Sequence, residues 1–143
     1  MERLDPDKIL IIDDEKSLRD GAERILGRMG CEVFKAETGE EGLEIINREP
    51  VSIVLLDMRM PGMDGMEVLQ KLTEMDEGII VIVITGFATI ETAIEAMKTG
   101  AYDFISKPYE PDQLRIAVNR GREKVRLKRD TRKLRDEQQQ TLE

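Results

Sequence analysis

A short apolar run that stops on a carboxylate constrains this chain more than any other feature. Residues 51–56 read Val-Ser-Ile-Val-Leu-Leu and are followed by Asp57 and then by a Pro-Gly turn at 61–62. An apolar run of this length, rich in β-branched residues and closed by turn residues, indicates a strand buried on both faces. Such strands form parallel sheets, and open α/β folds build their sites at the carboxyl edge of the sheet. Asp57 is therefore predicted to lie at a functional edge.

Apolar runs alternate with helical patterns along the rest of the chain. Four further segments are predicted as strands: Lys8–Ile12, Glu32–Ala36, Ile79–Ile84 and Tyr102–Ile105. Apolar residues recur at helical spacing over Ser17–Met29, Thr38–Ile46, Gly65–Leu72, Thr89–Thr99 and Pro111–Val125. Strict alternation of strands and helices predicts an α/β fold with one parallel sheet, right-handed crossovers and helices on both faces.

Two residue types that often carry chemistry are scarce or missing. The chain of 143 residues has a single cysteine, Cys31, and no histidine. This composition excludes a disulfide framework, a Cys-rich metal site, His-based acid–base catalysis and His-ligated zinc within this chain. Because the chain shows neither a signal peptide nor an apolar run long enough to span a membrane, we expect a cytoplasmic protein without membrane contacts.

Charge is distributed unevenly along the chain. The net charge is −8, yet residues 120–135 hold nine basic and two acidic side chains, a local charge of +7 that leaves −15 on the rest. An acidic body argues against direct nucleic-acid binding by the globular part. The basic segment allows two interpretations, a solvated helix or a helix that pairs with a second copy. Val118 with Val125 and Leu127 with Leu134 have the seven-residue spacing of a pairing helix, but Lys128 and Arg132 interrupt the heptad and Gly121 weakens the helix, so the solvated helix is preferred.

Polar residues of particular kinds lie at the ends of four predicted strands. Asp13 and Asp14 follow the first strand, Asp57 ends the third, Thr85 follows the fourth, and Lys107 follows the fifth. Because the carboxyl ends of parallel strands share one edge, these residues are predicted to converge in one shallow pocket. Each strand contributes its residue independently, which makes the set more specific than any single motif.

The predicted pocket has the chemistry of a phosphoryl-transfer site. Three carboxylates close together repel one another, and a hard divalent cation with oxygen ligands, Mg²⁺, relieves that repulsion. Lys107 supplies a positive charge for a phosphate oxygen, and the Thr85 hydroxyl can donate a hydrogen bond to another. Asp57 is then the natural nucleophile, because carboxylates form aspartyl-phosphate intermediates.

The same elements resemble the receiver domain of two-component response regulators. The matching motifs are Ile-Asp13-Asp14-Glu15, Leu-Leu-Asp57-Met-Arg-Met-Pro61-Gly-Met-Asp-Gly65, Ile-Thr85-Gly86 and Ser-Lys107-Pro108, in the family's order. The resemblance covers residues 8–122 and implies a flavodoxin-like (CheY-like) fold, a doubly wound five-stranded parallel sheet. The strand order in folds of this kind is 2-1-3-4-5.

The resemblance also implies roles for individual residues. Asp57 is expected to take a phosphoryl group from the histidine of a sensor kinase. The backbone carbonyl of Arg59 is expected to join the carboxylates of Asp13, Asp14 and Asp57 around Mg²⁺. The Lys107–Pro108 peptide is expected to be cis. Thr85 and Phe104 match the family's switch positions. Movement of Thr85 and Lys107 toward the phosphoryl group is expected to pull the loop at 87–88 and to let Phe104 turn inward.

Residues 85–104 look like receivers of the NtrC/DctD class, which precede an ATPase module that activates sigma-54-dependent transcription. No Walker motif and no helix-turn-helix occur in the sequence. The chain is therefore expected to be either a stand-alone regulator or a fragment whose ATPase and DNA-binding domains are missing from this sequence, and the fragment is favoured because the sequence stops inside a charged helix. Residues 1–122 are assigned to the receiver domain and 123–143 to a C-terminal linker helix. A homodimer is expected through the fourth and fifth helices and the C-terminal extension.

Two other functions remain open from the residues alone. An aspartate-nucleophile phosphohydrolase, resembling the haloacid-dehalogenase class, would carry its nucleophile in an Asp-x-Asp at the end of the first strand, whereas this chain has Asp13-Asp14-Glu15 there and offers no cap domain. A receiver-like module that is never phosphorylated would serve only as a binding platform. The complete acidic set argues against the platform. A phosphoacceptor whose only catalysis is its own phosphotransfer and dephosphorylation is the preferred interpretation.

Overall fold

Strands and helices alternate strictly in the computed structural model, which describes residues 4–59, 62–75, 78–86 and 90–142. The elements are β1 (Lys8–Ile12), α1 (Lys16–Arg28), β2 (Glu32–Ala36), α2 (Gly39–Arg48), β3 (Ile53–Asp57), α3 (Gly65–Met75), β4 (Ile80–Thr85), α4 (Ile90–Thr99), β5 (Asp103–Ser106) and α5 (Pro111–Leu142). The predicted α/β alternation is confirmed.

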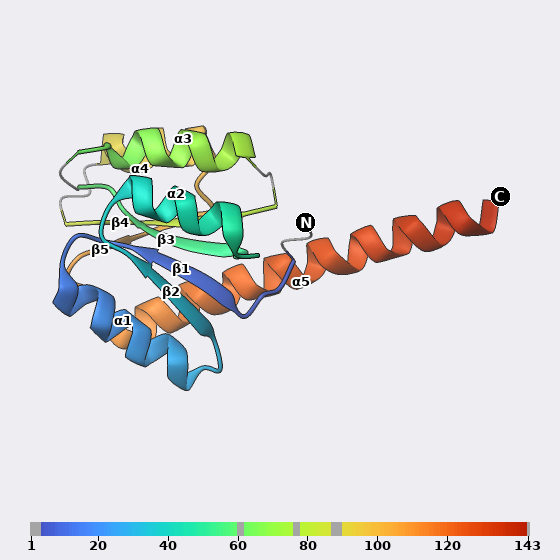
Figure 1. Cartoon of the computed structure of the whole chain (residues 1–143), viewed down its shortest axis with the longest axis horizontal. Helices are drawn as coiled ribbons and strands as arrows, with labels where there is room; N and C mark the ends of the chain where they lie inside the picture. The colour runs from blue at the N-terminus through green and yellow to red at the C-terminus, as the bar shows by residue number, and fades with distance from the viewer. Residues whose placement is uncertain (1–3, 60–61, 76–77, 87–89, 143) are drawn as a thin grey trace.

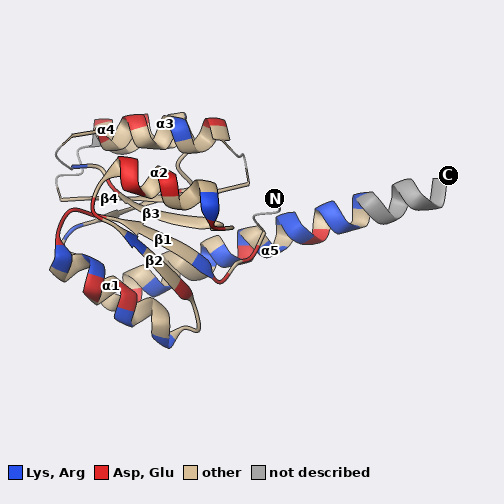
Figure 2. Cartoon of the chain, in the orientation of Figure 1, with Lys and Arg blue, Asp and Glu red and all other residues tan. Residues whose placement is uncertain are grey.

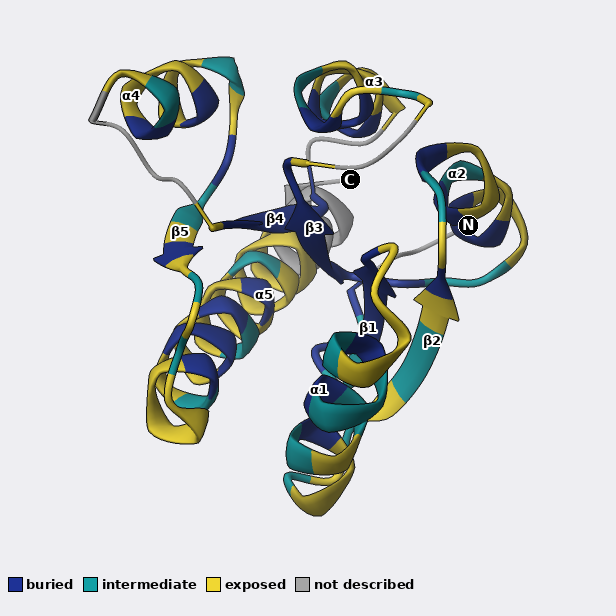
Figure 3. Cartoon of the chain, turned by 90° about the vertical axis from the view of Figure 1, so that its left-hand side faces the viewer, coloured by how far each residue is buried: buried dark blue, intermediate teal, exposed yellow. Residues whose placement is uncertain are grey.

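One parallel sheet carries all five strands, in the order β2-β1-β3-β4-β5. This is the order that the receiver resemblance implies. Figure 3 shows α1 and α5 on one face of the sheet and α2, α3 and α4 on the other, and Figure 1 shows the same two layers from another side. The crossovers therefore place every strand's carboxyl end on the same edge.

Successive residues of the central strands point into two separate cores. On β1, Leu10 and Ile12 belong to the core beneath α2, α3 and α4, whereas Ile9 and Ile11 belong to the core beneath α1 and α5. All five residues of β3 are buried. A strand buried on both faces has no solvent-facing side, which explains why β3 is an unbroken apolar run up to Asp57 at its end rather than an alternating pattern.

The polar residue at the end of a strand is part of the sheet in three of the five strands. Asp57 pairs with Ile84, and Thr85 pairs with Ser106. The observed β3, β4 and β5 thus extend one residue further than the apolar runs, which end at 56, 84 and 105. Pairing within the sheet fixes the backbone of Asp57 and Thr85, so their side chains are held rigidly at the edge.

The last helix leaves the body of the domain. α5 runs unbroken from Pro111 to Leu142, and its second half projects beyond the sheet (Figure 1). Its basic side chains are concentrated on the projecting part (Figure 2). The predicted domain boundary at 122 lies within this continuous helix and stays a prediction. No helix in the described part of the chain is both long and apolar enough to cross a membrane.

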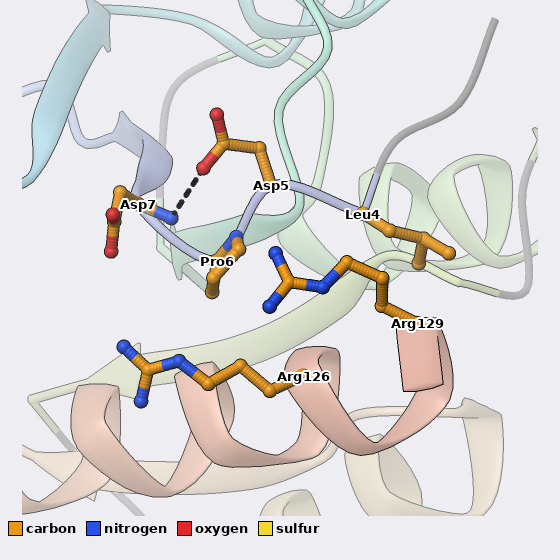
Figure 4. A pocket seen from close by; sticks show the side chains of 6 residues that line it. All are labelled: Leu4, Asp5, Pro6, Asp7, Arg126 and Arg129. Atoms are coloured by element: carbon orange, nitrogen blue, oxygen red, sulfur yellow. Dashed lines mark hydrogen bonds between the residues drawn. The ribbon is translucent and has the colours of Figure 1, made fainter. Parts of the chain in front are cut away.

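The N-terminal segment holds the base of α5. Leu4 is buried, and the Asp7 carboxylate accepts hydrogen bonds from Arg122 Nε at 3.1 Å and Nη2 at 2.6 Å. Figure 4 shows Arg126 and Arg129 of α5 turned toward the backbone of this segment, whose Asp7 N–H donates to the Asp5 carboxylate. This cluster lies at the amino edge of the sheet, at the opposite end of β1 from Asp13.

Candidate phosphoacceptor site

Three carboxylates gather at the carboxyl edge of the sheet. Asp13 and Asp14 follow β1, Asp57 ends β3, and an oxygen from each lies within 4.8 Å of the others. The side chains of Asp13 and Asp57 are buried, and that of Asp14 is exposed. The convergence predicted from the sequence is therefore observed for all three carboxylates.

Backbone N–H groups hold the two buried carboxylates in place. Asp13 Oδ1 accepts a hydrogen bond from the N–H of Glu15 at 2.9 Å, and Asp57 Oδ1 accepts one from the N–H of Arg59 at 3.1 Å. Both contacts close a turn over two residues, the usual geometry of an Asp that begins a loop. In each carboxylate the second oxygen, Oδ2, faces Lys107.

Lys107 lies between the two buried carboxylates. Its ammonium Nζ is 3.1 Å from Asp13 Oδ2 and 3.3 Å from Asp57 Oδ2, and its side chain is itself mostly buried. The Lys107 N–H donates to the Thr85 carbonyl at 2.9 Å, which ties this residue to the end of β4. The peptide between Lys107 and Pro108 is cis, as expected.

Negative charge exceeds positive charge within this cluster. Burial, together with the neighbouring Asp13 carboxylate, raises the pKa of Asp57 to about 6, although the Arg59 N–H and the Lys107 ammonium oppose the shift. For Lys107, burial lowers the pKa, but the two carboxylates outweigh burial and raise it above its ordinary value. Lys107 thus stays charged, yet one ammonium does not neutralise three carboxylates.

The donor set fits a hard divalent cation. Carboxylate oxygens on an exposed rim, with one member open to solvent, are the ligands that Mg²⁺ prefers when it keeps part of its water shell. Burial is the main cause of the raised pKa of Asp57, and the Asp13 carboxylate adds to it, so a cation bound beside these carboxylates would stabilise their charged forms. Asp13, Asp14 and Asp57 are therefore able to hold Mg²⁺; the Arg59 carbonyl remains a predicted fourth protein ligand.

The two predicted switch residues lie in different surroundings. Thr85 is buried at the end of β4, one residue beyond the sheet partner of Asp57. Phe104 lies on β5 with 40% of its surface exposed and lines an apolar groove with Ala93, Ile94 and Met97 of α4. Phe104 is thus outside the pocket, and its inward turn stays a prediction. Residues 60–61 and 87–89, including Pro61 of the quoted motif and the expected switch loop, lie outside the described residues.

One residue of the site's surroundings was missed from the sequence. Arg19 of α1 is 8% exposed, and its guanidinium donates to the backbone carbonyl of Asp13. A signal was present, because Arg19 lies three residues before Ala22 and seven before Leu26, the other buried residues of α1. A cation on the buried stripe of a helix is unusual and calls for a local partner.

Comparisons with known proteins agree with this geometry. The family model for the response regulator receiver domain matches residues 9–119. Sporulation initiation phosphotransferase F of Bacillus subtilis is 36% identical over 114 residues, 80% of this chain and 92% of that protein. The C4-dicarboxylate transport transcriptional regulatory protein DctD of Rhizobium meliloti is 36% identical over 127 residues, 89% of this chain but 28% of that protein.

Solved structures give the same picture. NtrX from Brucella abortus superposes with a TM-score of 0.84 at 36% identity, over 89% of this chain and 29% of that one. A CheY-like receiver domain protein from Methanospirillum hungatei superposes with a TM-score of 0.81 at 32% identity, over 85% of this chain and 97% of that one. The chain thus spans less than a third of DctD and NtrX and nearly all of the single-domain proteins.

Proposed function

The chain belongs to the response regulator receiver domain family, and from this membership we propose that Asp57 is the phosphoacceptor of a two-component signalling switch. The donor is the phosphohistidine of a sensor histidine kinase. The observation that carries the proposal is the contact of a buried, backbone-anchored Asp57 carboxylate with Lys107, beside two further carboxylates. This arrangement brings together a nucleophile, a cation and a metal-binding set.

The proposed step is a displacement at phosphorus. A carboxylate oxygen of Asp57 forms a bond to the phosphoryl group as the P–N bond of the kinase's phosphohistidine breaks, and the electron pair of that bond stays on the imidazole. The Lys107 ammonium stabilises charge on one phosphoryl oxygen, and the Thr85 hydroxyl donates to another. Mg²⁺ held by Asp13, Asp14 and Asp57 supplies the remaining charge neutralisation when bound.

The contacts of Lys107 suggest how the step can be read out. In the unphosphorylated protein Lys107 contacts both buried carboxylates. A phosphoryl group on Asp57 would offer its oxygens to Lys107 and to the Thr85 hydroxyl as new contacts. We propose that their movement lets Phe104 leave its exposed position and biases the surface of α4, β5 and α5 toward one of two arrangements. The domain then acts as a phosphoacceptor that catalyses only its own phosphotransfer and dephosphorylation.

Exposed apolar side chains support dimerisation as the output. On α4, β5 and α5 they are Ile94, Met97, Phe104, Ile116, Leu127 and Leu134, each at least 40% exposed. We propose that phosphorylation changes pairing through this surface and the projecting half of α5. Light scattering with and without beryllofluoride, a phosphoryl mimic, measures this change, and an unchanged mass in both conditions would contradict the dimer readout.

The full-length protein is proposed to be a transcription regulator of the NtrC/DctD class. The similarity to DctD and NtrX, which are both several times longer than the matched region, supports an ATPase and a DNA-binding domain that act in sigma-54-dependent transcription. Such a regulator would work in the cytoplasm beside its kinase. This proposal concerns the whole protein and is independent of the chemistry at Asp57.

Labelling by a small phosphodonor tests the phosphoacceptor directly. With acetyl phosphate and Mg²⁺, the wild-type protein is expected to gain a phosphoryl group and Asp57→Asn to gain none. Asp103→Asn removes a carboxylate at the amino end of β5, the end away from Lys107. It is the matched control and should be labelled at the wild-type level. Labelling of Asp57→Asn at the wild-type level would refute the assignment. Sustained release of phosphate from a phosphomonoester would instead favour the phosphohydrolase.

A further inference from the structure

A buried arginine stands behind the acidic pair. Among the residues that the structure describes, Arg19 is the one buried residue with a positive charge; the other buried polar side chains are Asp13, Ser52, Asp57 and Thr85. Burying a guanidinium costs several kcal/mol unless hydrogen bonds and charges compensate. An apolar residue at this position would pack without that cost, so the contacts that Arg19 makes need an explanation.

The strongest contact of Arg19 is to the backbone of Asp13. Its Nη1 donates to the Asp13 carbonyl at 2.7 Å, within the buried interior, and its Nη2 reaches Glu37 Oε1 at 3.4 Å. Glu37 is 68% exposed, so that ion pair is screened by solvent and weak. The short, buried bond to the carbonyl is therefore the main interaction of this side chain.

This bond fixes the peptide that joins the two acidic residues. The carbonyl of Asp13 and the N–H of Asp14 belong to one planar unit, so holding the carbonyl sets the plane from which Asp14 begins. On its other side, the Asp13 N–H donates to the Ala36 carbonyl at 3.1 Å. Asp13 is therefore anchored before and after its side chain, by β2 and by α1.

We propose that Arg19 is a positioning residue of the metal-binding set, which holds the Asp13–Asp14 peptide so that both carboxylates face Asp57. The inference rests on the proposed function, because it assigns Arg19 to the affinity for Mg²⁺ that phosphorylation needs. Outer partners that orient metal ligands typically affect metal affinity by about 10–100-fold when they are removed. Arg19 touches neither phosphate nor metal, so its effect acts through Asp13 and Asp14.

An NMR titration with Mg²⁺, without any phosphodonor, measures the proposed effect. The backbone amide signals of Asp13, Asp14 and Asp57 give the apparent Kd for wild type, Arg19→Lys and Arg19→Gln. Lysine keeps the charge but lacks the planar fork, and glutamine keeps one donor without the charge. Both variants are expected to weaken Mg²⁺ binding by about tenfold. Glu37→Gln, which changes only the weak contact, is the matched control and should shift the Kd less than about twofold.

A merely structural role gives a different result. Both substitutions of Arg19 would then lower the melting temperature but leave the Kd for Mg²⁺ at its wild-type value. That result would overturn the inference. The wild-type protein offers a check without any variant. Its Arg19 guanidinium signals are expected to shift with the same Mg²⁺ midpoint as the Asp14 amide, and signals that do not move would also overturn it.

Phosphorylation measured against Mg²⁺ concentration separates this inference from the proposed function. If the wild type labels and Asp57→Asn does not, the phosphoacceptor stands. Arg19→Lys is then expected to need about tenfold more Mg²⁺ for half its maximal rate, with a near-normal rate at saturation. If the wild type fails to label, the proposed function fails, whereas a normal Mg²⁺ midpoint in a labelling Arg19→Lys protein refutes only the positioning role.

Discussion

The two ends of β1 carry two charge clusters of opposite character. At the amino edge, Arg122 places two donors on the single carboxylate of Asp7, which is 46% exposed. At the carboxyl edge, Lys107 contacts both Asp13 and Asp57, whose side chains are 6% and 3% exposed, with Asp14 close by. The Asp7–Arg122 pair has one charge of each sign and access to solvent, whereas at the carboxyl edge a single ammonium contacts two of three clustered carboxylates.

The difference indicates which cluster performs chemistry. A matched pair with access to water is stable as it stands and can hold the N-terminal segment against α5. At the carboxyl edge, burial and then the neighbouring Asp13 carboxylate raise the pKa of Asp57, so the charged form of this carboxylate is disfavoured there and a bound cation would relieve it. The amino edge is thus a structural anchor, and the carboxyl edge is poised to bind and react.

Removing Lys107 should produce the largest change in stability. Lys107→Met leaves two buried carboxylates without their cation. Removing one partner of a buried ion pair lowers the free energy of unfolding by about 3–5 kcal/mol. Urea unfolding in EDTA at neutral pH should show a loss of that order, and added Mg²⁺ should recover most of it because the metal binds only the folded state. A loss that Mg²⁺ leaves unchanged would contradict a shared metal and lysine site.

Removing the charge of Asp57 should stabilise the metal-free protein. Its folded-state pKa of about 6 exceeds its ordinary value of 3.8, so the folded state holds the proton more tightly and ionisation destabilises it. Asp57→Asn should therefore gain up to about 3 kcal/mol in EDTA at pH 7. In the wild type, Asp57 becomes protonated as pH falls through about 6 toward about 4, and its destabilising effect on the folded state disappears. The stability gained by Asp57→Asn should therefore shrink in that pH range. A gain that is independent of pH would refute the electrostatic cause.

Breaking the Asp7–Arg122 pair at the amino edge should lower the free energy of unfolding by a smaller amount, and Mg²⁺ should not change that loss. In Arg122→Met the Asp7 carboxylate can turn to water, so we expect a loss of about 1 kcal/mol in urea unfolding, equal with and without Mg²⁺. Burial raises the pKa of the nearby Cys31 thiol and Arg122 opposes that shift, so this pKa should rise further in the variant. A large stability loss rescued by Mg²⁺ would erase the distinction between the two edges.

A substitution at Gly121, where α5 crosses the amino edge of the sheet, should raise the stability of the protein slightly. Gly121 is buried, and a Cβ built there would lie 3.5 Å from Ile53 Cδ1 and from Ile80 Cγ2, an ordinary packing distance. Gly121→Ala should therefore stabilise α5 by about 0.5–1 kcal/mol through helix propensity. Thermal unfolding measures the gain, and labelling with acetyl phosphate should proceed at the wild-type rate. A destabilised protein would show that α5 needs the glycine for a closer approach.

The strands and the carboxylate cluster could be predicted from the sequence because both follow from local pattern. A parallel strand covered by helices on both faces must be apolar throughout, so β1, β3 and β4 stand out as unbroken runs. Once the strands are parallel, their ends must share one edge, which brings Asp13, Asp57 and Lys107 together without any knowledge of their distances. The cis peptide at Lys107–Pro108 and the strand order came from the family resemblance.

Contacts that depend on tertiary packing could not be predicted in this way. Its spacing places Arg19 on the apolar stripe of α1 with Ala22 and Leu26, but no local pattern indicates that its guanidinium donates to the Asp13 carbonyl. Asp7 and Arg122 are 115 residues apart, and nothing local to either one indicates the other. Gly121 predicts a weakened helix, yet α5 is continuous because its first half is buried against the sheet.

Trapping the phosphoryl group on its residue identifies the phosphoacceptor. Borohydride reduces an aspartyl phosphate to homoserine, and peptide mass spectrometry then locates the reduced residue. After reaction with acetyl phosphate and Mg²⁺, we expect reduction at position 57 alone, and none when EDTA replaces Mg²⁺. Reduction at Asp13 or Asp14, or labelling that persists in EDTA, would contradict a metal-dependent phosphoacceptor at the end of β3.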